Sequence, residues 1–215
     1  RPEGAAARWT DLAVLATPAV RAAIDFSGRM DSQGRLDWDA PAGESRVMRF
    51  VASNTGQTLE CPSPNSDGLI IDHLSREAAT VDMTYILDKL LSGRKSLDAL
   101  KSFMLDSYEV AEAVDWTDDF VEAFRTRHGY DPIPYLPALF DPAAFHAGNA
   151  GRFLYDYHKT VSDLIIENHF RTVRDVLNRR GVRLLAEAGH GGSARVDPLK
   201  ALGSVDIPMG EFWNH

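Results

Sequence analysis

The spacing of hydrophobic and polar positions changes near residue 70 of this 215-residue chain. Before that point, short alternating stretches lie among Pro, Gly, Ser and Asn residues, a pattern typical of β-strands joined by turns. We expect short strands at residues 22–27, 34–39 and 45–52, with turns at 31–34 and 41–43. Because no titratable cluster falls here, we interpret residues 1–67 as a β-rich structural insert.

From residue 68 onward, strand patterns alternate with helix patterns. Short apolar runs predict strands at 69–71, 103–108, 182–186 and 204–207. Helical spacing predicts helices over about 75–91, 117–128 and 152–180, shorter helical pieces at 96–101 and after Pro198, and an irregular loop at 130–148. Ser75 is the expected N-cap of the first helix, and Val81 and Leu87 belong to its expected apolar stripe. Such alternation predicts a parallel sheet.

The predicted fold class is α/β. Residues 68–215 are interpreted as part of a (β/α)8, TIM-like barrel, because acids follow several predicted strands and barrel sites lie at the carboxyl ends of the strands. A doubly wound sheet is the alternative, but no Gly-rich phosphate-binding fingerprint follows any predicted strand.

Composition and residue spacing argue against several classes of function. The net charge of −8, without any Lys/Arg block, argues against nucleic-acid binding. No apolar run approaches the roughly 20 residues that span a bilayer. The histidines show no H-E-x-x-H spacing, so a zinc site is not expected. The chain begins at Arg1 and ends just after its best candidate site, and we therefore expect it to be an interior segment of a longer protein.

Two acids carry the strongest chemical signal. Glu109 follows the apolar run at 103–105, and Glu211 follows the run Val205 to Met209. Two carboxylates at strand ends suit glycoside hydrolysis, in which one protonates the leaving oxygen and the other activates water or attacks. The alternative is that each acid is an N-cap or a surface residue. Their recurrence in one context, with Trp213 beside the second, favours a site.

Further candidates surround these two acids. Glu187 is a third acid at a predicted strand end, and the Gly-rich stretch after it carries His190, which could contact a ligand because glycines permit close backbone approach. The alternative is that Glu187 and His190 hydrogen-bond to each other in a tight turn. The candidate substrate-binding residues are Asp72, His190, Asp206 and Trp213.

An ordered series of motifs gives the chain a family resemblance. The segments are Asp106-Ser-Tyr-Glu-Val, Asp115-Trp-Thr, Phe124-Arg-Thr-Arg-His-Gly-Tyr-Asp, Tyr135-Leu-Pro-Ala-Leu, Arg152-Phe-Leu-Tyr-Asp-Tyr, Ile166-Glu-Asn-His-Phe and Val205-Asp-Ile-Pro-Met-Gly-Glu-Phe-Trp, preceded by Leu36-Asp-Trp-Asp-Ala-Pro-Ala-Gly-Glu. Together they resemble the α-L-rhamnosidases of glycoside hydrolase family 106. The match covers most of the chain, and the ordered series is more specific than any one motif.

The resemblance implies a large multidomain hydrolase with a (β/α)8-type catalytic domain. Such an enzyme removes terminal α-L-rhamnose from an oligosaccharide, polysaccharide or glycoside with inversion, uses a calcium ion, and is periplasmic or secreted. By motif, Glu109 would be the general acid and Glu211 the general base. The opening barrel strands are missing, so calcium ligands stay unassigned, although Asp106 would suit a hard cation. We expect the isolated segment to be inactive.

Two alternatives remain open. The chain could belong to another (β/α)8 glycosidase with retaining chemistry, whose carboxyls lie about 5–5.5 Å apart rather than the about 6.5–9.5 Å of inverting enzymes. It could also be a non-catalytic carbohydrate-binding or structural segment in which both acids are caps.

Overall fold

A computed structural model gives the architecture of the chain. It describes residues 9–18, 23–40, 42–59, 62–96, 98–108, 114–142, 150–189 and 195–210. The chain divides into two compact units. The first contains Arg1–Ile70 and Asp118–Tyr157, and the second contains Ile71–Thr117 and His158–His215. The predicted boundary between residues 67 and 68 stays a prediction.

The first unit contains an antiparallel sheet. Its strands are β1 (Trp9–Pro18), β2 (Ile24–Asp25) and β3 (Ser45–Ser53), in the order β2-β1-β3. The sequence predicts strands near 22–27 and 45–52, but it does not predict β1. The predicted strand at 34–39 is wrong, because this segment makes only an isolated bridge between Met30 and Leu36. Leu36 and Trp38 pack instead on the core of the sheet, which explains the alternating pattern.

Helices and an aromatic cluster complete the first unit. They are α2 (Phe120–His128), the 3-10 helix η1 (Ile133–Leu139) and the beginning of α3 (Ala150–Leu164). The prediction of an irregular loop at 130–148 is wrong for η1, where the Asp131 carboxylate accepts the Ile133 N–H at 3.0 Å. Residues 143–149 lie outside the described part of the chain. Phe120, Phe124, Phe153 and Tyr157 are almost fully buried and contact one another.

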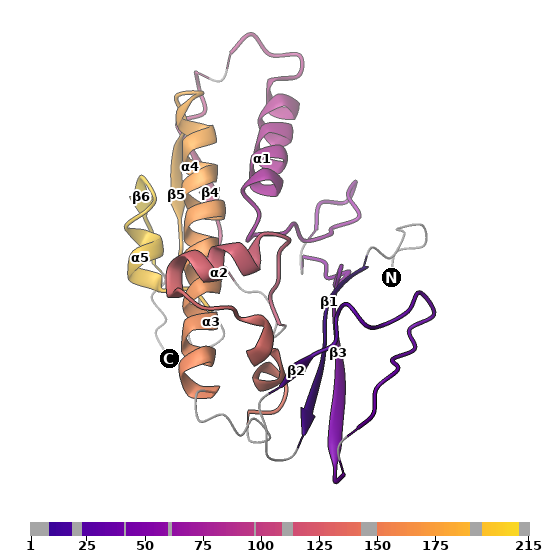
Figure 1. Cartoon of the computed structure of the whole chain (residues 1–215). Coiled ribbons are helices and arrows are strands. Elements are labelled where there is room, and N and C mark those ends of the chain that lie inside the picture. Colours follow the sequence, from indigo (N-terminus) through magenta and orange to yellow (C-terminus); the bar gives the residue numbers. More distant parts are fainter. Residues whose placement is uncertain are drawn as a thin grey trace, which may run out of the picture. The chain divides into compact units, whose positions relative to one another are not determined.

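The second unit is built on the predicted parallel sheet. Strands β4 (Ser102–Leu105), β5 (Arg183–Ala186) and β6 (Ile207–Pro208) run parallel in the order β4-β5-β6, which confirms that prediction. Figure 1 shows α4 (Arg171–Asn178) against β5, with α1 (Arg76–Leu91) beside α4. The short helix α5 (Pro198–Leu202), capped by Asp197, lies where the sequence predicts it. The structure is a mixed α/β architecture.

Helix α1 follows its predicted bounds but not its predicted face. The Ser75 side chain accepts the Ala78 N–H at 3.2 Å and so caps the helix as expected. Leu87 is fully buried, but Val81 is 63% exposed, and Ala79 and Met83 take the inner positions. The stripe is therefore rotated from the one predicted.

Two further predictions are wrong. Residues 96–101 do not form a helical piece in their described part, because Ser96 and Asp98 hydrogen-bond locally and so compete with helical bonding. The run at 69–71 is not a strand; Leu69 makes only an isolated bridge with Thr58.

The predicted long helix at 152–180 is continuous but not uniform. α3 passes into a π-helical segment, η2 (Ile165–Phe170), and then into α4, so helical geometry extends from Ala150 to Asn178. π-Helical turns are rare and recur at functional sites. Here the segment carries Asn168 and His169.

Candidate functional site at the carboxyl edge of the parallel sheet

The three parallel strands end at the same level. Beyond the strand bounds, Glu187 N donates to Leu105 O at 3.2 Å, Tyr108 N to Ala188 O at 2.9 Å, and Met209 N to Ala186 O at 2.9 Å. Hydrogen bonding thus continues past β4 and β6 on either side of β5. The segments after all three strands therefore start from one edge, the place where α/β proteins gather functional side chains.

The structure does not place all of the predicted site residues at this edge. Glu187 lies at the end of β5 and is 7% exposed. Asp72 lies at the start of the loop before α1, in the same unit. Asp206 lies at the other, amino-terminal edge, where its carboxylate accepts the Leu184 N–H at 2.8 Å. The structure does not bring Asp206 together with the others. Outside the described residues lie Glu109, His190, Glu211 and Trp213.

Three aromatic side chains pack together where the chain leaves β4. The His73 ring meets Tyr108 edge-on with centroids 5.1 Å apart, and meets His169 edge-on at 4.6 Å. Tyr108 and His169 are buried. Burial lowers the pKa of His73 to about 4 and, together with the charge of His73, that of His169 to about 3. Both imidazoles are therefore neutral at physiological pH.

The π-helical segment places one of these imidazoles. Asn168 donates its side-chain amide to Leu74 O at 2.7 Å and so ties η2 to the loop that carries Asp72 and His73. His169 follows directly, and its ring packs against His73. Its Nδ1 is buried without a hydrogen-bond partner. A buried nitrogen without a hydrogen-bond partner costs free energy. A functional role is one reason why a protein retains such a group.

Two carboxylates lie near the Tyr108 phenol. The Asp72 carboxylate accepts the Thr117 hydroxyl at 2.8 Å and the Leu74 N–H at 2.9 Å. Asp115 lies 3.5 Å from an Arg195 nitrogen. Burial raises the pKa of Asp115, Arg195 opposes this, and Asp72 adds to it. Burial, with the charges of Asp115 and Asp72, also raises the pKa of Tyr108.

Tyr108 therefore stays a protonated phenol at any physiological pH. It is held in place by its neighbours, and it immediately precedes Glu109 in the chain. The edge thus combines the buried Tyr108 phenol with a half-buried carboxylate, Asp115, and an exposed one, Asp72. Burial favours the protonated form of a carboxyl group, as at Asp115, and general acid catalysis requires a protonated carboxyl.

The described residues do not fit a calcium site on their own. Within them, no group of three or more His, Cys, Asp or Glu side chains is close enough together to hold a metal ion. Asp106, the acid that would suit a hard cation, is exposed, and its carboxylate accepts the Ser107 N–H at 2.9 Å.

Comparison with known proteins identifies the family. The family model of glycoside hydrolase family 106, described as alpha-L-rhamnosidase, matches residues 6–215. The chain belongs to glycoside hydrolase family 106. The matched residues therefore include the strands β4, β5 and β6 and every candidate site residue.

Two similar proteins add detail. The structure of a rhamnosidase from Novosphingobium sp. PP1Y matches with a TM-score of 0.72 and 28% sequence identity, over 86% of this chain and 18% of that one. A curated protein of Formosa agariphila, named "Putative beta-glucuronidase", is 30% identical over 195 residues, which are 89% of this chain and 16% of that protein. This chain thus spans less than a fifth of either relative.

The sequence alone does not predict two of the contacts at this edge. The sequence runs and motifs include Asp72, Asp115 and Tyr108. However, no sequence pattern indicates that His73 contacts His169 or that Asp115 pairs with Arg195. Each of these pairs joins segments that are distant in sequence. One signal that could have found them is the position of Asn168-His169 within a family motif that otherwise reads as a buried helix.

Proposed function

We propose that this chain is the catalytic segment of an enzyme that releases terminal α-L-rhamnose from a glycoside with inversion of configuration. Glu109 is the general acid and Glu211 the general base. The observation that carries the proposal is the parallel order β4-β5-β6 in a chain that belongs to family 106. In this order the segments that lead to the two acids start from one edge, on either side of β5.

The spacing of the strands leaves room for an inverting pair of carboxyls. β4 and β6 are separated by one strand, and neighbouring strands lie about 4.8 Å apart, so their backbones are about 10 Å apart. An inverting enzyme holds its two carboxyls about 6.5–9.5 Å apart, and backbones separated by one strand leave room for that distance. The choice of inversion rests on the family resemblance, and the anomer of the first-formed product tests it.

The proton transfers follow from this assignment. Glu109, which follows the buried Tyr108 in the chain, acts as a protonated carboxyl and donates its proton to the glycosidic oxygen as the bond breaks. Glu211 stays ionised, accepts a proton from water on the opposite face of the sugar, and directs that water to the anomeric carbon. The His73–Tyr108–His169 group acts by holding the backbone that leads into Glu109.

We also propose that the sheet is an arc of a (β/α)8 barrel completed by parts of the protein beyond this chain. The support is the parallel order of three strands with helices between them, and the length of the family relatives. A crystal structure of the full-length protein tests this. A sheet that stays open, with helices on both faces, would reject the barrel.

Calcium use rests on the family resemblance alone. If it holds, chelation of the full-length enzyme should abolish hydrolysis and lower its melting temperature, and calcium rather than zinc should restore both. Unchanged activity and melting after chelation would reject it.

The decisive experiment compares variants of the full-length protein on two substrates. Aryl α-L-rhamnoside should be hydrolysed, and aryl β-D-glucuronide tests the activity named for the Formosa agariphila relative. Glu109→Gln and Glu211→Gln should each lower kcat by about 100-fold or more, whereas Glu77→Gln, at an exposed position of α1, should not.

The product reveals the stereochemistry. Proton NMR of the first-formed rhamnose should show the β-anomer. The α-anomer would reject inversion, hydrolysis of the glucuronide alone would reject the rhamnosidase assignment, and full activity of both glutamine variants would reject the catalytic role of these acids.

A further inference from the structure

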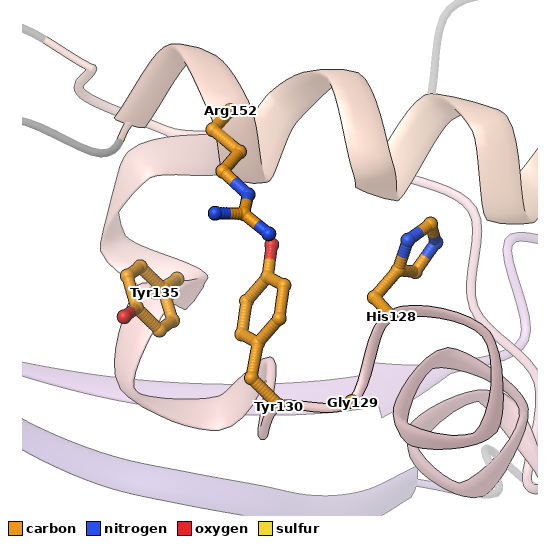
Figure 2. A pocket seen from close by; sticks show the side chains of 5 residues that line it. All are labelled: His128, Gly129, Tyr130, Tyr135 and Arg152. Carbon is orange, nitrogen blue, oxygen red and sulfur yellow. The ribbon is translucent and has the colours of Figure 1, made fainter.

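The first unit contains a pocket whose chemistry the rhamnosidase proposal does not use. It has a volume of about 280 Å³ and is lined by His128, Gly129, Tyr130, Tyr135 and Arg152. Figure 2 shows Tyr130 between Tyr135 and His128, with Arg152 extending from α3 toward the hydroxyl end of Tyr130. The volume lies just below the roughly 300–1,000 Å³ range of small-molecule sites. It suits one sugar ring rather than a chain of several.

The aromatic walls of the pocket are held rigidly. The Tyr130 hydroxyl donates to the Asp156 carboxylate at 2.9 Å, and the Tyr130 and Tyr135 rings meet edge-on with centroids 5.4 Å apart. Tyr135 stacks on the buried Phe153 ring at 5.5 Å. Burial and the bond to Asp156 raise the pKa of Tyr130, so the phenol stays neutral. Fixed aromatic faces with polar tips are typical of sites that bind amphipathic rings.

Arg152 is the cation of the pocket and is loosely held. Its guanidinium carbon lies 5.8 Å above the Tyr130 ring, and its Nε lies 3.7 Å from Asp156, beyond hydrogen-bond distance. Asp156 already accepts the Tyr130 hydroxyl and lies 3.4 Å from His128 Nδ1. The Arg152 side chain is 73% exposed. An exposed, long ion pair contributes little, so Arg152 can turn to a ligand at small cost.

We propose that this pocket binds a single uronic acid residue of a polysaccharide. The Arg152 guanidinium binds the sugar carboxylate through a bidentate pair of hydrogen bonds, and the sugar ring packs against Tyr130 and Tyr135. Guanidinium and carboxylate match in this geometry, which a point charge does not reproduce. The site is a binding site in the first unit, and its existence does not depend on the rhamnosidase assignment.

The test measures binding to the full-length protein by titration calorimetry or ligand-observed NMR. The probes are methyl β-D-glucuronide, its neutral counterpart methyl β-D-glucoside, and acetate. Methyl β-D-glucuronide should bind, and the other two should bind at least about tenfold more weakly. Arg152→Gln should weaken glucuronide binding by about tenfold or more, and Arg152→Lys should lose part of it because the charge stays but the fork is lost.

A matched control is available on the sheet side of the same unit. Arg29 also lies over an aromatic ring, with its guanidinium carbon 5.5 Å from the Phe26 centroid, but it does not line the pocket. Arg29→Gln should leave binding unchanged. The proposal is overturned if the wild type does not bind the glucuronide, if Arg152→Gln binds it as well as the wild type, or if Arg29→Gln weakens it equally. Equal binding of the glucoside or of acetate also overturns it.

Discussion

Glu109 and Glu211 perform different halves of the proposed proton transfer, and the leaving group separates them. A good leaving group, such as dinitrophenol, needs little protonation but still needs an activated water. Glu109→Ala should therefore lose about 100-fold or more in kcat/KM on an alkyl rhamnoside and much less on the dinitrophenyl rhamnoside. Glu211→Ala should be impaired on both. Steady-state kinetics with the two substrates measure this, and the reverse pattern would exchange the two roles.

The buried imidazoles predict how the stability of the second unit depends on pH. The pKa of His73 is lowered to about 4 and that of His169 to about 3, whereas an unfolded histidine titrates near pH 6.5. Between these limits the unfolded state binds more protons, so stability is retained above about pH 6.5 and falls as the pH falls toward about 4. The combined loss should be a few kcal/mol.

Pulse proteolysis in urea, with cleavage sites in residues 165–175 as the readout, measures this dependence. His73→Phe and His169→Phe keep an aromatic ring but remove the titrating group. Each should flatten the fall between about pH 6.5 and pH 4. A fall as steep as that of the wild type would show that other groups cause it.

At the scale of the element, two glycines should respond oppositely to the same change. Gly129 ends α2 in the left-handed region with φ of 74°, whereas Gly151 lies within α3, where an added Cβ would meet no atom within 4 Å. Gly129→Ala should destabilise the end of α2 by about 1 kcal/mol, because a side chain is unfavourable at positive φ. Gly151→Ala should stabilise the start of α3 by about 0.5–1 kcal/mol.

Hydrogen–deuterium exchange of peptides from α2 and α3 measures both effects in the full-length protein. Exchange should become faster around residues 125–130 in the first variant and slower around 150–156 in the second. Slower exchange at α2 in Gly129→Ala would contradict the backbone argument.

At the scale of the whole molecule, the parallel sheet predicts how the chain behaves alone. Among the described strands, β4 and β6 each pair on one side only. Met104 on β4 is 51% exposed. Unpaired parallel edges with exposed apolar side chains promote association. The 215-residue chain expressed alone should therefore be inactive and should self-associate.

Size-exclusion chromatography with light scattering, together with the rhamnoside assay, tests this. Extending the chain toward the length of the family relatives should restore a defined size and activity. A monomeric, active 215-residue product would overturn the expectation.

Local sequence determined most elements of the second unit. The apolar runs at β4 and β5 are short and bounded by turn residues, and the caps Ser75 and Asp197 act through their own side chains on nearby N–H groups. Such signals depend only on neighbours in the chain. The ordered motifs also led to the correct family, because a series of short segments is more specific than any one of them.

Tertiary packing decided what local pattern could not. Leu36 and Trp38 alternate like a strand, but they do so because a loop packs onto Phe26, and Val81 of α1 faces outward because Ala79 and Met83 fit the inner face. Among the described acids of the predicted site, Glu187 lies at the carboxyl edge of the parallel sheet, whereas Asp206 lies at the opposite edge. The meeting of His73 with His169, and of Asp115 with Arg195, joins distant segments. Contacts of this kind depend on how helices and loops pack in three dimensions, which no local spacing encodes.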